Sequence, residues 1–280
     1  MLVFGAIAPH GGDTIAEIAD NPRVMAKTRA GMQELGRRFV RANPETVVVL
    51  NPHGAIVEDA ISIGVGEVAF GVLGDDKRQV QTAFATDLAF IQDIARAANA
   101  EATQYSSSIP LIGIRGKQSR GSAESIVWLD WGALVPLWFT AHTMEPRPKV
   151  VVIAPNRSLP RETLVRCGVA IARAAEASGK RVALIASCDQ GHAHDADGPY
   201  GYAPDSAIHD EAMCQAIRDN DLDRLLGWPE AFLEDAKVDA YWQTIMLAGA
   251  IGHTPMRGEL ISYEAPTYFG MAVAAYTPVE

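Results

Sequence analysis

The sequence predicts an α/β fold, in which one domain holds a central, mostly parallel sheet with helices on both of its faces. Short runs of Val, Leu, Ile and Ala alternate with longer segments whose apolar residues recur at helical spacing. This alternation is typical of a sheet covered by helices. The breaks between segments are short and rich in Gly and Pro, and none resembles a linker. We therefore expect a single domain over residues 1–280, which is long enough to bury one large core.

The first elements in chain order form a β-α-β unit. Residues 2–8 and 47–50 are aliphatic runs typical of buried strands, and residues 23–42 carry apolar side chains at helical spacing until Asn43 and Pro44 stop the helix. The same criteria predict strands at 60–65, 149–155, 181–187 and 259–265, and helices at 80–99, 133–142, 160–178, 206–218, 221–226, 229–235 and 239–250. Residues 113–125 form the most flexible-looking segment, either a loop or a lid.

Composition and charge exclude several classes of function. The net charge of −10 and the lack of a basic run argue against nucleic acid or an anionic membrane as partner. Residues 1–9 lack the basic region of a signal peptide, and no apolar run approaches the ~20 residues of a spanning helix, so we expect a cytoplasmic protein. The three cysteines have no metal-binding spacing and are expected to be reduced.

The tripeptide Pro-His-Gly occurs twice, each time directly after a predicted strand. His10 follows the strand at 2–8, and His53 follows the strand at 47–50. Composition alone predicts roughly 0.03 occurrences of this tripeptide in the chain. In α/β sheets, ligands bind outside the carboxyl ends of the strands, so the two imidazoles are expected to converge on one site.

Other polar residues occupy similar positions. His192 and His194 follow the strand at 181–187, and Glu264 lies at the end of the strand at 259–265. Two neutral imidazoles and one carboxylate form a set that holds Fe(II) and leaves open positions for substrate and oxygen. Alternation sends His192 and His194 in opposite directions, so one of the two is expected to serve the site.

The chain resembles the class III extradiol ring-cleavage dioxygenases, the superfamily of the protocatechuate 4,5-dioxygenase β subunit, which includes the Memo-like proteins. The matching segments are the two strand-Pro-His-Gly units, DWGALVPL (130–137), ASCDQGHAHDADGPYGYAPD (186–205) and SYEAPTYFGMAVAAY (262–276). The resemblance implies a mixed sheet flanked by helices and a homodimer or larger oligomer, in some members with a related subunit. It also implies that His10, His53 and Glu264 ligate Fe(II), with Zn or Mn as other candidate metals, and that His192 is the acid-base residue.

The chain also departs from the family pattern. Trp131 stands where many members have a histidine, and Cys188 to Gly191 change the lining beside His192. We expect the substrate pocket to include Trp131, Asp189, His194 and Tyr263. A carboxylate of the substrate would meet Arg115, Lys117 or Arg120 if the 113–125 segment folds over the site.

The resemblance implies a dioxygenase that uses O₂ to cleave a catechol-type or aminophenol-type ring in aromatic catabolism. His192 would accept the substrate proton and return it during cleavage. Two alternatives stay open at the level of sequence. A metal-dependent hydrolase could use the same ligand types, and a Memo-like or inactive partner subunit would keep the fold without catalysis.

Overall fold

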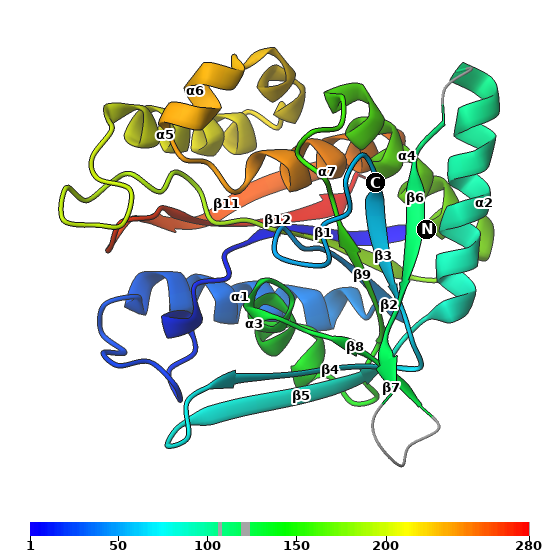
Figure 1. The fold of residues 1–280 in the computed structure, drawn as a ribbon, viewed down its shortest axis with the longest axis horizontal. Helices are drawn as coiled ribbons and strands as arrows, with labels where there is room; N and C mark the ends of the chain where they lie inside the picture. The colour runs from blue at the N-terminus through cyan, green and yellow to red at the C-terminus, as the bar shows by residue number, and fades with distance from the viewer. Residues whose placement is uncertain (106–107, 119–123, 280) are drawn as a thin grey trace.

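The computed structural model describes residues 1–105, 108–118 and 124–279. Its central layer is an eight-stranded sheet (Figure 1) in the order β11-β12-β1-β10-β2-β9-β3-β6. Its strands, in chain order, are β1 (Leu2–Ala8), β2 (Thr46–Leu50), β3 (Ile61–Val65), β6 (Leu111–Arg115), β9 (Lys149–Ala154), β10 (Val182–Ser187), β11 (Met256–Glu264) and β12 (Met271–Pro278). The neighbours β1, β10, β2 and β9 pair in parallel, whereas β12 is antiparallel to both β1 and β11. The predicted mixed, mostly parallel sheet is confirmed.

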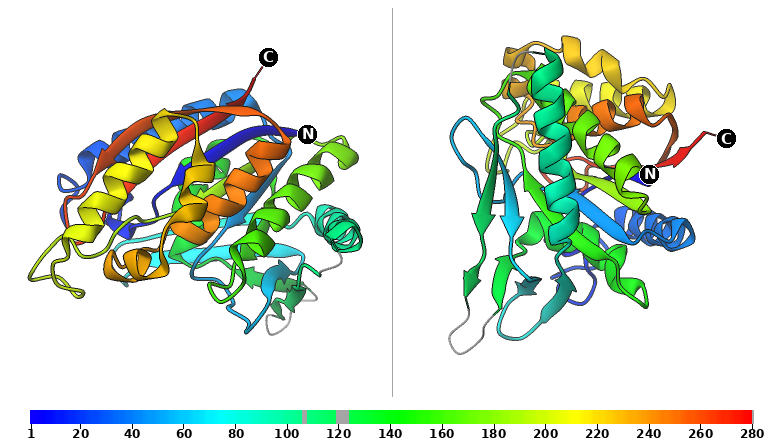
Figure 2. Two further views of the ribbon diagram at one scale, coloured as in Figure 1. Left: turned by 90° about the horizontal axis from the view of Figure 1, so that it is seen from above. Right: turned by 90° about the vertical axis from the view of Figure 1, so that its right-hand side faces the viewer.

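Helices cover both faces of this sheet, as predicted. On one face α2 (Leu88–Tyr105), α4 (Arg161–Ser178) and α7 (Tyr241–His253) lie side by side (Figure 2), with α5 (Pro204–Arg218), η3 (Leu222–Gly227) and α6 (Glu230–Asp235) next to them. The other face is covered by α1 (Ala26–Ala42) and α3 (Trp131–Phe139), with the short helices η1 (Gly12–Thr14) and η2 (Ala141–Thr143). Alternate residues of β2 enter separate cores: Val48 and Leu50 pack on the α4 side, and Val47 and Val49 on the α1 side. This double burial explains the unbroken aliphatic run at 47–50.

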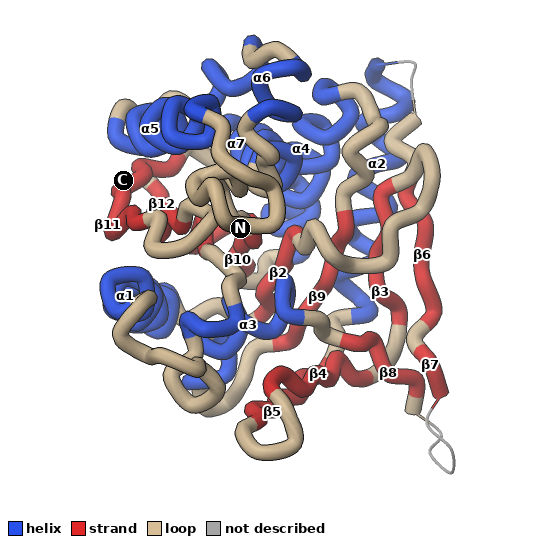
Figure 3. Tube along the Cα trace, turned by 60° about the vertical axis from the view of Figure 1, so that its left-hand side comes forward, coloured by secondary structure: helices blue, strands red, loops and turns tan. Residues whose placement is uncertain are grey.

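A second, four-stranded sheet lies below α3 at one end of the molecule (Figure 3). Its strands are β4 (Val68–Gly74), β5 (Gln79–Ala85), β7 (Lys117–Gln118) and β8 (Ser125–Trp128), in the order β5-β4-β8-β7. The predicted helix 80–99 is therefore wrong over its first part. In β5 the side chains of Val80, Thr82 and Phe84 are buried and their neighbours are exposed, so the two-residue period of a strand prevails.

The other predicted elements are present with shifts of a few residues at their ends, and 221–226 is a 3-10 rather than an α-helix. The sequence did not predict β12, whose Ala-rich run MAVAAYTP has low strand propensity and becomes a strand by pairing between β1 and β11. The segment predicted as a loop or lid contributes to β6 and β7, and its residues 119–123 lie outside the described residues. None of the described helices has the length and hydropathy needed to span a membrane. All three cysteines are free and buried.

A buried carboxylate fixes α2 to the central sheet. Asp87 accepts hydrogen bonds from Lys180 Nζ at 2.8 and 2.6 Å, from Thr46 Oγ1 at 2.6 Å and from the Phe90 amide at 3.1 Å. Its side chain is 1% exposed. Burial alone would raise the pKa of Asp87, but Lys180, Thr46 and the Phe90 amide outweigh burial and lower it. Asp87 thus caps α2 and joins it to β2 and to the start of β10.

Replacing Asp87 with Asn is expected to destabilise the protein by about 3 kcal/mol at neutral pH, because Lys180 then loses its buried partner. Urea unfolding of both proteins measures this difference. The pKa of Asp87 is lower in the folded protein than in the unfolded chain, where it is about 3.9. Asp87 therefore stabilises the fold fully above about pH 3.9, and this stabilisation disappears as the pH falls through the pKa of the folded protein. The difference between the two proteins should therefore shrink below about pH 4. Asp93→Asn, which removes a surface pair with Arg96 on the same helix, serves as the control.

Candidate metal centre

Two imidazoles and one carboxylate meet at the carboxyl edge of the parallel strands. His10 lies just after β1, His53 just after β2, and Asp239 just before α7. The His10 Nε2 atom is 3.1 Å from His53 Nε2 and 3.1 Å from Asp239 Oδ2, and His53 Nε2 is 3.3 Å from the same oxygen. The three ligand atoms all lie within 4.8 Å of one another, which is the grouping a metal ion requires.

The ring of His10 is oriented by a hydrogen-bond relay from β10. Its Nδ1 atom is 2.9 Å from Ser187 Oγ, and that hydroxyl donates to the carbonyl oxygen of Gly132 at 2.5 Å. Because the Ser187 hydroxyl donates its hydrogen bond to the Gly132 carbonyl, its oxygen accepts a hydrogen bond from His10 Nδ1–H. The Nε2 lone pair of His10 is then free to point at His53 and Asp239, as in a histidine ligand held by its other nitrogen.

His53 is held by the start of α3. Its backbone amide donates to Asn51 Oδ1 at 3.1 Å, and Asn51 Nδ2 donates to Asp130 Oδ1 at 2.8 Å. Asp130 also accepts from the Ala133 amide and so caps α3. A side chain at Gly132 would place its Cβ 2.1 Å from Asn51 Oδ1, so only glycine fits there. The Trp131 ring lies against His53, with centroids 4.6 Å apart.

The two oxygens of the Asp239 carboxylate have different surroundings. Its Oδ1 accepts a short hydrogen bond from Arg157 Nη2, while its Oδ2 faces the two imidazoles and has no hydrogen-bond donor among the described residues. Burial alone would raise the pKa of Asp239, but His10, His53 and Arg157 outweigh it and hold the pKa far below its usual range. A buried, ionised oxygen without a donor, facing two imidazole nitrogens, fits a divalent cation.

Asp189 adds a second carboxylate beside His10. Its Oδ1 accepts from the His10 amide at 2.9 Å, and its Oδ2 lies 3.3 Å from His10 Nε2. Burial raises the pKa of Asp189 despite this neighbour. Burial alone would lower the pKa of His10, but Asp189 and Asp239 outweigh it and raise that pKa. A divalent cation bound at this cluster would compensate the two buried carboxylates.

A cavity of about 1030 Å³ joins this cluster to His192. His53, Asp239 and His192 line it together with Arg157 and Tyr200. The Nδ1 atom of His192 is 2.8 Å from the carbonyl oxygen of Gln190, which can only accept, so Nδ1 carries the proton and Nε2 is the basic nitrogen. The ring stacks on Phe269, with centroids 5.5 Å apart.

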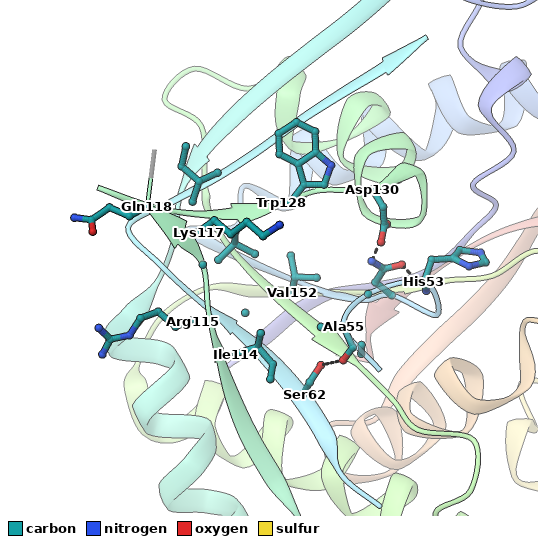
Figure 4. A pocket seen from close by; sticks show the side chains of 17 residues that line it. His53, Ala55, Ser62, Ile114, Arg115, Lys117, Gln118, Trp128, Asp130 and Val152 are labelled. Atoms are coloured by element: carbon teal, nitrogen blue, oxygen red, sulfur yellow. Dashed lines mark hydrogen bonds between the residues drawn. The ribbon is translucent and has the colours of Figure 1, made fainter. Parts of the chain in front are cut away.

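A second cavity, of about 760 Å³, begins on the other side of His53 (Figure 4). Ser62, Ile114, Trp128 and Val152 line it between β3, β6, β8 and β9. Arg115 and Lys117 also line this cavity and not the one shared with His192, and Arg120 lies outside the described residues. The structure therefore does not bring the two described cations of the 113–125 segment to the cavity that contains His192.

The structure brings together two of the three residues in the sequence-based ligand set. His10 and His53 are brought together, but Glu264 is elsewhere: its Oε1 accepts from the Thr28 amide at 2.6 Å and from Thr28 Oγ1 at 2.7 Å. The reason is strand order, because β12 separates β11 from β1 and places Glu264 two strand spacings, roughly 10 Å, to the side. Asp239 lies beside the two histidines instead and is the candidate third ligand. The sequence did not point to it, because an Asp at the start of an apolar helix resembles a helix cap.

The residues expected in the substrate pocket have different surroundings. Trp131 contacts His53, and Asp189 contacts His10. His194 and Tyr263 are absent from the lining of both cavities; each donates to Asp210 instead. These two residues therefore lie against Asp210 and outside the described pockets.

Comparison with known proteins identifies the family. A family model described as the catalytic LigB subunit of aromatic ring-opening dioxygenase matches residues 5–274. The chain belongs to this family. The resemblance inferred from the sequence is thus confirmed.

This LigB-family chain is similar to a curated protein and to a solved structure. Protein CA_C1420 of Clostridium acetobutylicum is 22% identical over 269 residues, which are 95% of this chain and 56% of that protein. The chain thus spans about half the length of this curated relative. The crystal structure of the uncharacterized protein JW3007 from Escherichia coli K12 has a TM-score of 0.58 at 15% identity and covers 98% of this chain and 99% of that one. The likeness to JW3007 shows a shared fold.

Replacing Asp239 with Asn is expected to remove the bound metal, whereas Glu264→Gln should retain it. Asp239 offers an ionised oxygen to the cluster, and Glu264 holds Thr28 instead. Metal content per chain after dialysis, measured by mass spectrometry, compares the two variants. Metal loss in Glu264→Gln with full occupancy in Asp239→Asn would restore the original assignment.

Proposed function

We propose that this LigB-family chain is an Fe(II)-dependent extradiol dioxygenase that cleaves the ring of a catechol or an aminophenol with O₂. The observation that carries the proposal is the shared cavity of about 1030 Å³, which places a basic imidazole, His192, beside the His10–His53–Asp239 cluster. Two imidazoles and one carboxylate form the set that suits Fe(II) and leaves positions open for two further ligands.

His10, His53 and Asp239 would hold the metal in this proposal. Bound Fe(II) supplies Lewis acidity, which lowers the pKa of a catechol hydroxyl, and an electron path from the ring to O₂. The protein keeps the three ligands oriented through Ser187, the Asn51–Asp130 pair and Arg157. These supports make the ligand geometry rigid before substrate arrives.

His192 would move the proton. Its Nδ1–H is committed to the Gln190 carbonyl, so Nε2 is free to accept the proton of a substrate hydroxyl. The same nitrogen would then return the proton to the opening ring. Stacking on Phe269 limits rotation of the imidazole and keeps this nitrogen directed.

The remaining walls of the cavity suit an aromatic substrate. Leu159, Leu233, Val238 and Trp242 provide apolar surface, and Arg157 stacks over the Trp242 ring at 4.4 Å. Among the described residues of this cavity, His192 and His53 are the two imidazoles. Since His53 belongs to the metal cluster and position 131 is a tryptophan, His192 carries the acid-base role by itself.

Replacing His192 with Gln is expected to leave iron content unchanged and to lower kcat by about 100-fold or more, because the general base is lost while the metal ligands remain. The assay is oxygen uptake by the anaerobically reconstituted protein with catechol, protocatechuate, gallate and 2-aminophenol, together with the absorbance of the ring-opened product. The control is His253→Gln, which changes a surface histidine paired with Glu176.

The wild-type protein in the same assay decides between reaction classes. Stoichiometric iron with ring opening supports the dioxygenase. A zinc-loaded protein that hydrolyses ester or amide substrates without oxygen uptake would contradict it in favour of a hydrolase. A protein that binds no metal and consumes no oxygen would contradict it in favour of a non-catalytic, Memo-like role.

A further inference from the structure

A buried carboxylate outside the metal cluster gathers four hydrogen-bond donors. Asp210 on α5 is 1% exposed. Its Oδ1 accepts from the Gly191 amide at 2.8 Å and from His209 Nδ1 at 2.8 Å, and its Oδ2 accepts from His194 Nε2 at 2.9 Å and from the Tyr263 hydroxyl at 2.8 Å. The donors come from α5 itself, from the loop after β10 and from β11. Such a carboxylate joins three separate segments.

Two glycines allow the backbone to approach closely around Asp210. A Cβ at Gly270 would lie 1.8 Å from Asp210 Oδ2, and one at Gly191 would lie 2.8 Å from Ser206. The same two glycines pair through their backbones, since the Gly270 amide donates to the Gly191 carbonyl at 3.0 Å. Burial alone would raise the pKa of Asp210, but hydrogen bonds from His194 and His209 lower it, so the carboxylate is ionised.

The segment held by Asp210 is the loop that carries His192. This loop, residues 188–194, has Asp189 at one end against His10, and His192 at the other end in the large cavity. Asp210 binds Gly191, the residue directly before His192. The His192 amide in turn donates at 3.0 Å to the carbonyl of Ala236, three residues before Asp239.

We propose that Asp210 is the positioning residue that holds the 188–194 loop, and with it the basic nitrogen of His192, at a fixed place beside the metal cluster. The inference rests on the proposed function, in which His192 transfers the proton. Asp210 lines neither described cavity, so it would act through His192 and not on the substrate. The proposal also gives a role to His194 and Tyr263, which bind Asp210 and line neither described cavity.

The test is Asp210→Asn, which keeps the shape but replaces one acceptor oxygen by an amide donor facing two donors. The expected result is a loss of about 100-fold in kcat, with KM and iron content unchanged, because small misplacement of a catalytic group has effects of this size. In the His192→Gln background the same substitution should cost nothing further. Additive losses, or loss of iron, would overturn the proposal.

A second readout needs neither metal nor substrate. In ¹⁵N-histidine-labelled, metal-free protein, Asp210→Asn should shift the ring signals of His192, while Glu211→Gln, an exposed neighbour on the same helix, should not. Unchanged His192 signals in Asp210→Asn would refute the positioning role. If wild type cleaves no ring, the proposed function fails alone and these signals still decide the role of Asp210. If Asp210→Asn does not fold, Tyr263→Phe repeats the test. It removes one of the four hydrogen-bond donors to Asp210, so the His192 ring signals should shift by a smaller amount.

Discussion

Parallel pairing of β1, β10, β2 and β9 is the constraint on which the rest of the structure depends. Because these strands are neighbours and run the same way, the loops that follow them begin at one edge of the sheet. His10, Asp189, His53 and Arg157 all come from those loops. Residues almost 180 positions apart in the chain thus meet within hydrogen-bond distance, as ligand sites of α/β sheets require.

The assembled site concentrates charge on buried side chains, namely His10, Asp189 and Asp239. Asp239 is the centre of this arrangement, since it accepts from Arg157 on one side and faces His10 and His53 on the other. Two buried carboxylates near one imidazole are costly to desolvate unless a proton or a cation compensates them. The buried charge therefore favours a bound cation at this place, independently of any reaction.

Two further carboxylates hold the parts of the molecule that surround this site. Asp130 caps α3 and fixes Asn51 below His53, and Asp210 holds the loop that carries His192. Both are aided by glycines, at 132 and 270, whose missing side chains make room for the polar atoms. The acid-base residue and the ligands are thus supported by separate networks that converge on one cavity.

The sequence by itself determined the fold class, the strand ends after which His10, His53 and His192 lie, and the family. These features are local: aliphatic runs bounded by Pro and Gly are visible without knowing which strands are neighbours. The tertiary structure determined which carboxylate lies beside His10 and His53. Glu264 also ends a strand, but β12 separates that strand from β1, whereas Asp239 reaches the two histidines from a helix start far along the chain. Strand order and helix packing depend on long-range contacts that local sequence patterns do not contain. They place Asp239, and not Glu264, beside the two histidines, and they place His194 and Tyr263 against Asp210.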